Sequence, residues 1–282
     1  MVRREPLHRE QVAVLATLAL LTVIAWAVTI AQMSGMAEMG GSTASAPASM
    51  DMGRPAGQEP GVRLAVYLGM WVSMMAAMML PAAAPMILMF GTVYRQKRDR
   101  GAAFVPTWVF VAGYLAAWTA YGLLGFGIYR GVSALDLGFL AWDEQGPIVA
   151  GAAVAVAGLY QLTPLKEICL RHCRSPMHFL LHGWHEGRLG ALRMGVEHGL
   201  YCVGCCWGLM LVLIALGVMS LFWMAVVAAV IFAEKVLPFG ARLHRPLAVL
   251  LVGLGIWVAA APSTVPGLTQ PGTMTKMQEM KP

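Results

Sequence analysis

The sequence predicts an all-α membrane protein, a polytopic bundle of about seven transmembrane helices. Hydrophobic residues make up 59% of the 282 residues and charged residues 12%, about half the charged share of an average soluble protein. Apolar runs long enough to cross a bilayer as helices recur along the chain. The basic residues lie beside these runs, so membrane anchoring explains the net charge of +6 and no nucleic-acid partner is expected.

The apolar runs give seven predicted spans, of which the fourth and the seventh are the shortest. The first is too long for the apolar core of a signal peptide and is not directly followed by a small-residue cleavage site, so we expect it to be retained. Pro81 and Pro85 interrupt the second span and are expected to kink it. The predicted spans are residues 12–31, 64–90, 104–128, 148–162, 194–216, 221–237 and 247–261.

The distribution of Lys and Arg predicts the orientation of the bundle. With the N-terminus inside, 15 of the 20 basic residues stand in inner segments and 5 in outer segments. Cytoplasmic loops carry such an excess. We therefore expect a multi-pass protein of the bacterial inner membrane, with its N-terminus inside and its C-terminus outside.

This topology divides the chain into four parts: an N-terminal transmembrane anchor (1–31), a Met-rich outer loop (32–61), a helix bundle (62–261) and a Met-rich outer tail (262–282). The loop and the tail cannot bury enough apolar area to fold alone. Within the bundle, residues 165–193 form a cytoplasmic segment rich in Cys and His. Thr163-Pro164 predicts the start of an amphipathic helix lying at the membrane surface, and Ser175-Pro176 opens a second short helix to about Glu186.

Cysteine and histidine are concentrated in one window of the chain. All five cysteines and five of the seven histidines lie between Cys169 and Cys206. Helical spacing places Cys169 beside Cys173, and His198 on one row with Cys202 and Cys206. The candidate metal ligands in this window are Cys169, Cys173, His198, Cys202, Cys205 and Cys206.

Thiolate and imidazole groups bind Cu(I), Zn(II) and related ions. We expect Cu(I), with zinc as the alternative, held in a site close to the inner membrane face. The spacing leaves open a site with two, three or four ligands, and a reducing cytosol argues against disulfides. The competing interpretation is that the cysteines are small buried apolar residues. The sequence does not decide the roles of His178, His182 and His185, because a solvated helix face also carries such residues.

Methionine is the second unusual feature, with 21 residues. Thioethers are neutral, soft ligands that favour Cu(I) over zinc. Methionines recur at intervals of three in both outer segments, where there is no core to pack, so we expect them to capture metal. These residues are Met33, Met36, Met39, Met274, Met277 and Met280.

A methionine row in the second span offers a route inward. Met70, Met74 and Met78 recur every four residues, although methionine also fills gaps between packed helices. Among the acidic residues, Glu197 precedes His198 and could orient its ring; pairing with Arg193 is the simpler interpretation. Glu234-Lys235 ends the sixth span, where the two side chains are expected to pair or to reach the interface.

Three segments resemble a bacterial family of predicted metal-binding integral membrane proteins of unknown function. They are the Met-rich stretch from Met70 to Pro81, the stretch from Tyr160 through Cys169 to Pro176, and His198-Gly-Leu-Tyr-Cys-Val-Gly-Cys-Cys-Trp207. The Glu234-Lys235 helix end also fits the family, and the match covers about residues 64–238. The resemblance implies membrane embedding and metal binding, but no reaction.

Three functions are compatible with these observations. The first is uptake or delivery of a soft metal ion, Cu(I), across the inner membrane, with a metallochaperone or a copper enzyme as partner. The second is a membrane-embedded metalloenzyme that performs redox or oxygen chemistry, and the third is a thiol-based sensor or assembly partner. We expect a non-enzymatic role, because no catalytic motif stands out.

Overall fold

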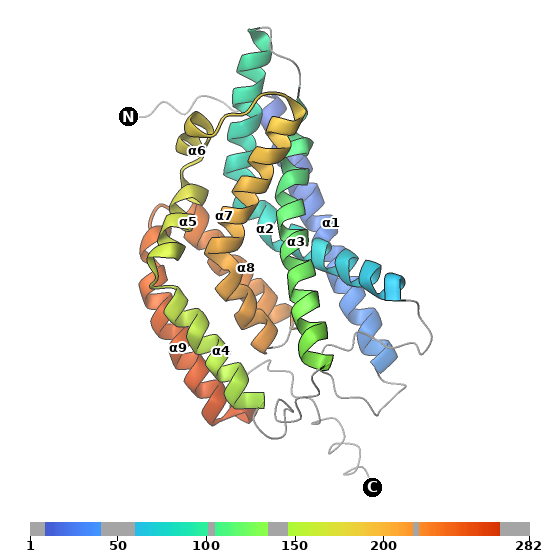
Figure 1. Ribbon diagram of the computed structural model, residues 1–282, viewed down its shortest axis with the longest axis vertical. Helices are drawn as coiled ribbons and strands as arrows, with labels where there is room; N and C mark the ends of the chain where they lie inside the picture. Colours follow the sequence, from blue (N-terminus) through green and yellow to red (C-terminus); the bar gives the residue numbers. More distant parts are fainter. Residues whose placement is uncertain (1–8, 41–59, 101–104, 135–145, 217–219, 266–282) are drawn as a thin grey trace.

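The structure, a computed structural model, describes residues 9–40, 60–100, 105–134, 146–216 and 220–265. This part of the chain is all-helical and contains no strand, as predicted. Figure 1 shows the helices gathered in one bundle. They are α1 (Arg9–Gly40), α2 (Pro60–Asp99), α3 (Thr107–Ala134), α4 (Gly146–Tyr160), α5 (Pro164–Arg174), α6 (Pro176–His182), α7 (Gly187–Leu216), α8 (Leu221–Val236) and α9 (His244–Ala260).

Within the described residues, four helices are long and apolar enough to cross a membrane: α1, α2, α3 and α7. The fourth predicted span corresponds to α4, which has 15 residues and passes the same test only together with α5, as a pair bent by 65°. Helices α8 and α9 have 16 and 17 residues, at or below the lower end of the length that spans a bilayer. The described chain thus offers four spans, or five with the bent pair.

Several predicted helix boundaries were wrong because helices continue past their apolar runs. Helix α1 ends at Gly40, so the backbone at Met33, Met36 and Met39 is helical where a loop was predicted. Helix α7 begins at Gly187, seven residues before the predicted start. Hydropathy marks the apolar part of a helix, whereas backbone hydrogen bonding carries the helix further. Most of the predicted outer tail, with Met274, Met277 and Met280, lies outside the described residues.

Helix α2 bends sharply in Figure 1, as the two prolines within it predict. Each proline removes a backbone N–H donor and crowds the preceding turn, which is the usual cause of a kink.

Glycines allow two pairs of helices to approach closely. Helix α3 packs along α7, where a Cβ at Gly195 would lie 3.1 Å from the backbone nitrogen of Tyr114. Helix α4 packs along α9, where a Cβ at Gly158 would lie 2.9 Å from the backbone nitrogen of Val252. Small residues bring membrane helices together in this way. A Cβ at Gly151 would likewise lie 2.9 Å from the backbone nitrogen of Ala259, so Gly151 and Gly158 are both packing positions.

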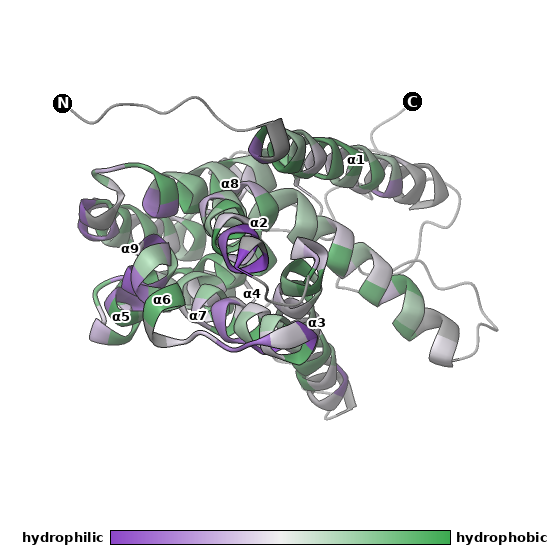
Figure 2. Cartoon of the chain, turned by 90° about the horizontal axis from the view of Figure 1, so that it is seen from above, coloured by the Kyte–Doolittle hydropathy of each residue, from purple (hydrophilic) through white to green (hydrophobic). Residues whose placement is uncertain are grey.

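One side of α5 packs into the bundle, whereas its position at the membrane surface stays a prediction. Helix α5 packs along α7 and also contacts α8, and it buries Lys166, Cys169 and Leu170. The break between α4 and α5 redirects the chain so that α5 runs beside the middle of α7. Seen from above in Figure 2, hydrophilic residues lie at α5 and α6 and also at the near end of α2, beside hydrophobic stretches of the bundle.

Candidate metal centre

Thiols from two helices meet where α5 packs along α7. The Sγ atoms of Cys173 on α5 and Cys205 on α7 are 3.8 Å apart, and those of Cys205 and Cys206 are 3.3 Å apart. Cys205 Sγ also donates to the backbone carbonyl of Cys202 at 3.2 Å, and Cys202 lies one turn before Cys206 on α7. We call these four residues the thiol cluster; none of them forms a disulfide.

The local sequence explains why the four thiols face one another. Positions 202, 205 and 206 are separated by three and four residues, so they share one face of α7. Gly204, between them in the sequence, lets α5 approach: a Cβ there would lie 2.6 Å from the Sγ of Cys169. The hydroxyl of Tyr160 donates a hydrogen bond to the carbonyl of the same glycine. Cys169 therefore packs against α7 one turn before Cys173.

Two buried polar side chains contact the Cys202 sulfur. Lys235 Nζ, at the end of α8, donates to Cys202 Sγ at 2.8 Å, and Tyr114 Oη on α3 lies 3.0 Å from the same sulfur. A buried ammonium is costly unless it has such a partner. Neither residue was predicted from the sequence as part of the site. The Glu234-Lys235 helix end was a usable signal for Lys235, whereas nothing in the sequence distinguishes Tyr114.

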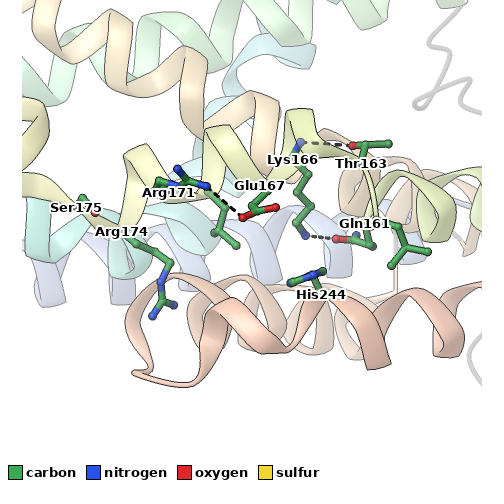
Figure 3. A pocket seen from close by; sticks show the side chains of 10 residues that line it. Gln161, Thr163, Lys166, Glu167, Arg171, Arg174, Ser175 and His244 are labelled. Atoms are coloured by element: carbon green, nitrogen blue, oxygen red, sulfur yellow. Dashed lines mark hydrogen bonds and ion pairs between the residues drawn. The ribbon is translucent and has the colours of Figure 1, made fainter.

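A buried ion pair joins α5 to α8 beside the thiol cluster. Lys166 Nζ lies 2.8 and 2.9 Å from the two carboxylate oxygens of Glu234, and the side chains are only 1% and 2% exposed. Lys166 also donates to Gln161 Oε1, in the break between α4 and α5 (Figure 3). The predicted pairing of Glu234 with Lys235 was wrong, because the two side chains bond to partners on different helices.

Arg174 at the end of α5 caps the end of α8. Its side chain donates to the backbone carbonyls of Glu234, Leu237 and Pro238. A cavity of about 250 Å³ lies beside α5, toward the start of α9, lined by Lys166, Arg174 and His244 among other residues (Figure 3). None of the five cysteines lines this cavity.

His198 lies one turn before Cys202 on α7 and is only 3% exposed. The rings of Phe110, Tyr114 and Phe179 surround it, with centroids 5.7 to 6.0 Å away. Its Nδ1 atom has no hydrogen-bond partner among the described residues. Glu197 instead accepts a hydrogen bond from Arg193 at 2.8 Å, so the simpler interpretation of that carboxylate is confirmed. An effect of Glu197 on the His198 ring stays a prediction.

The methionines of α2 lie in the core of the bundle. Met74 and Met78 are 7% and 1% exposed, and Met70 is half-buried. Helix α2 packs against α3 and α8. This burial suits both interpretations of the row, as packing residues and as ligands.

The spacing of the thiols suits a pair of ligands better than a preformed cage. In the described part of the chain, no group of three or more His, Cys, Asp or Glu side chains is arranged to hold a metal ion. With metal–sulfur bonds of about 2.3 Å, two sulfurs on one ion lie at most about 4.6 Å apart. The 3.8 Å between Cys173 and Cys205 is within that limit. Cu(I) is a soft ion that two thiolates can bind.

Comparison with known proteins identifies one matching family. Neither the curated proteins nor the solved structures give a match to the chain. Residues 68–258, which include α5, α7 and α8 with all the cysteines, match the PpoB2 family, described as a copper chaperone. This agrees with the copper prediction made from the Cys and Met residues. The chain belongs to the PpoB2 copper chaperone family.

Proposed function

We propose that the protein is a membrane-embedded copper chaperone that binds Cu(I) in the thiol cluster and delivers it to a copper-requiring partner. One observation carries this proposal: Cys173 of α5 and Cys205 of α7 come within 3.8 Å of each other from opposite sides of a helix interface. The family supports copper as the metal. The thiols favour Cu(I) as the bound ion over the harder cations.

Lys235 gives the cluster an internal counter-charge. A Cu(I) ion bound by two thiolates carries a net charge of −1, and burying an uncompensated charge is costly. The ammonium of Lys235, 2.8 Å from Cys202 Sγ, offsets that charge within the bundle. With the same two thiolates and the ammonium, a divalent ion would leave a net charge of +1 in the bundle, whereas Cu(I) leaves none. The site therefore suits a monovalent ion.

We further propose the predicted topology of seven spans, with the N-terminus inside, in the bacterial inner membrane. In support, the basic end of α2 and the start of α7 lie together: Lys97 Nζ is 3.4 Å from a carboxylate oxygen of Glu186, and Tyr94 donates to the carbonyl of Gly187. Both segments were assigned to the inner side from their basic residues. Helices α8 and α9 then cross as short spans.

In this topology copper moves inward from soft thioethers to thiolates. The outer methionines capture the ion, and the row of Met70, Met74 and Met78 on α2 leads it into the bundle. Thiolates bind Cu(I) more tightly than thioethers do, so the affinity rises along the route. An enzymatic role finds less support, since the cavity of about 250 Å³ lies beside α5 and no cysteine lines it.

Metal content of the purified protein tests the proposal. Elemental analysis after loading with Cu(I) should give copper bound to the wild type and a loss of most of it in the Cys173→Ser, Cys205→Ser double variant. Cys169→Ser is the matched control: it removes a thiol from the same face of α5 that packs against Gly204, and should retain copper. Equal copper in the wild type and the double variant would show that the thiol cluster does not bind it. Zinc in place of copper would overturn the choice of metal.

A further inference from the structure

A pair of histidines stands beside the thiol cluster and plays no part in the site described above. His172 immediately precedes Cys173 on α5, and its ring lies 6.3 Å from that of His178 on α6, between ring centroids, with the planes at 82°. His178 is exposed and His172 is partly exposed, in contrast to the buried cysteines of α7. We call these two residues the histidine pair.

Hydrogen bonding fixes the free nitrogen of His172. Its Nδ1 lies 2.9 Å from the backbone carbonyl oxygen of Ile168. A carbonyl only accepts, so Nδ1 carries the proton and the neutral ring has its lone pair on Nε2. Metal-binding histidines are oriented in the same way, by a hydrogen bond from one ring nitrogen that leaves the other as the ligand.

Stacking holds the same ring in place. The His172 ring is parallel to that of Tyr201 on α7, at 2° and 4.2 Å between centroids. Tyr201 directly precedes Cys202, so the stack joins the histidine pair to the thiol cluster across the helix interface. An exposed ring that is fixed by both a hydrogen bond and a stack is better ordered than a solvated side chain usually is.

The separation of the two rings matches a shared metal ion. Metal–nitrogen bonds of about 2.1 Å, with about 1.1 Å from nitrogen to ring centre, place two imidazoles on one ion at most about 6.4 Å apart between centroids. The observed 6.3 Å is within this limit. Cu(I) accepts linear coordination by two imidazoles, and imidazole is a suitable copper ligand.

The outer face of α5 is accessible to a carrier in water. Next to His172, Arg171 forms an ion pair with Glu167 at 3.1 Å, and the two side chains are 69% and 66% exposed. Charged groups so exposed are costly against acyl chains. The side of α5 that carries Glu167 and Arg171 therefore meets water, and His178, which is exposed, is the member of the histidine pair that a soluble copper carrier can reach first.

We propose that the histidine pair is a second, transient Cu(I) site through which copper enters or leaves the thiol cluster; this rests on the proposed function. During loading, the bond from Cu(I) to Nε2 of His172 forms as a bond to the carrier breaks. The bond to Nε2 then breaks as the sulfur of Cys173 binds, and the thiol proton passes to water. The copper stays Cu(I) throughout, so no oxidant or reductant takes part.

The test is the rate of copper loading, measured separately from the amount bound. Cu(I) is supplied to the full-length protein in detergent as its coloured bicinchoninate complex, and the loss of colour is followed by stopped flow. His172→Phe retains a ring on Tyr201 but removes the nitrogen ligand. It is expected to slow loading at least tenfold while binding the same final amount of copper. His172→Met restores a soft ligand without the ring and is expected to recover most of the rate.

The control and the contrary results separate this inference from the proposed function. His185→Asn changes a histidine outside the pair, whose Nδ1 bonds to the carbonyl of Gly183, and should load at the wild-type rate. Wild-type rates in His172→Phe and His178→Gln would overturn the histidine pair while leaving the thiol cluster intact. So would a slow His172→Met beside a fast His172→Phe, because that order indicates a role in stacking alone. Failure of the proposed function would appear instead as an amount of bound copper that does not depend on Cys173 and Cys205.

Discussion

The buried ion pair between Lys166 and Glu234 joins α5 to α8, and the loss of either partner is expected to lower the stability of the protein strongly. The side chains are 1% and 2% exposed, and Nζ contacts both carboxylate oxygens within 2.9 Å. Replacing Lys166 by Met leaves the Glu234 carboxylate buried without its counter-ion. Breaking a buried pair in this way costs about 3 to 5 kcal/mol. For a chain of this size each kcal/mol shifts Tm by about 2 to 4 °C, so Lys166→Met should lower Tm by about 6 to 20 °C.

Replacing the other partner, and both partners together, tests whether the unpaired buried charge causes the loss of stability. Glu234→Leu should lower Tm similarly, and the Lys166→Met, Glu234→Leu double variant should recover at least half of the loss, because it leaves no buried charge. The measurement is thermal unfolding of the detergent-purified protein, followed by tryptophan fluorescence. Arg171→Met is the control on the same helix: it removes an exposed pair with Glu167 and should cost less than about 1 kcal/mol. A double variant less stable than either single variant would refute the argument.

Three further results are expected. Gly195→Ala should destabilise the protein by about 1 to 3 kcal/mol, because its Cβ would meet the backbone of α3, whereas Gly69→Ala, with no atom within 4 Å of its Cβ, should leave Tm unchanged or higher; thermal unfolding compares the two. Lys235→Met should weaken Cu(I) binding about tenfold or more in a chelator competition titration, since the complex loses its buried counter-charge, and unchanged affinity would contradict that role. Free Cu(I) at 100 times its Kd should stabilise the wild type by about 2.7 kcal/mol, and Cys173→Ser, which binds Cu(I) more weakly, should lose most of this gain in the same unfolding assay.

Much of the candidate site could be predicted because its residues are close in sequence. Cys202, Cys205 and Cys206 share a face of one helix by spacing alone, and the pair of Cys169 and Cys173 shares a face of another. The concentration of these residues in one window predicted that the two helices meet. The finer result, that Cys173 contacts Cys205 while Cys169 packs against Gly204, depends on how the helices are placed along each other.

The position of α5 could not be predicted from its hydrophobic pattern. A lysine in an amphipathic helix is normally expected on the polar, exposed face. Lys166 is instead buried because Glu234, 68 residues later, supplies its counter-ion. Lys235 is likewise buried by a contact with Cys202. Such pairs join residues distant in sequence, so their burial follows from the tertiary structure and not from local periodicity.

The ends of the helices also could not be predicted exactly from local sequence. Apolar runs located the cores of α1, α2, α3 and α7 correctly, because a bilayer requires about 20 apolar residues in a crossing helix. The extension of α1 to Gly40 and of α7 back to Gly187 involves residues of mixed polarity. The break between α4 and α5 was visible as Thr163-Pro164, but the direction of the chain after it depends on packing against α7.

Copper K-edge X-ray absorption of the Cu(I)-loaded protein tests most directly whether the thiols of α5 and α7 hold the metal together. In the wild type, the first coordination shell should contain two or three sulfur atoms. In Cys173→Ser it should lose one sulfur, because Cys173 supplies the only thiol that the thiol cluster takes from α5. A shell of nitrogen or oxygen atoms alone, or the same number of sulfurs in both proteins, would contradict the account.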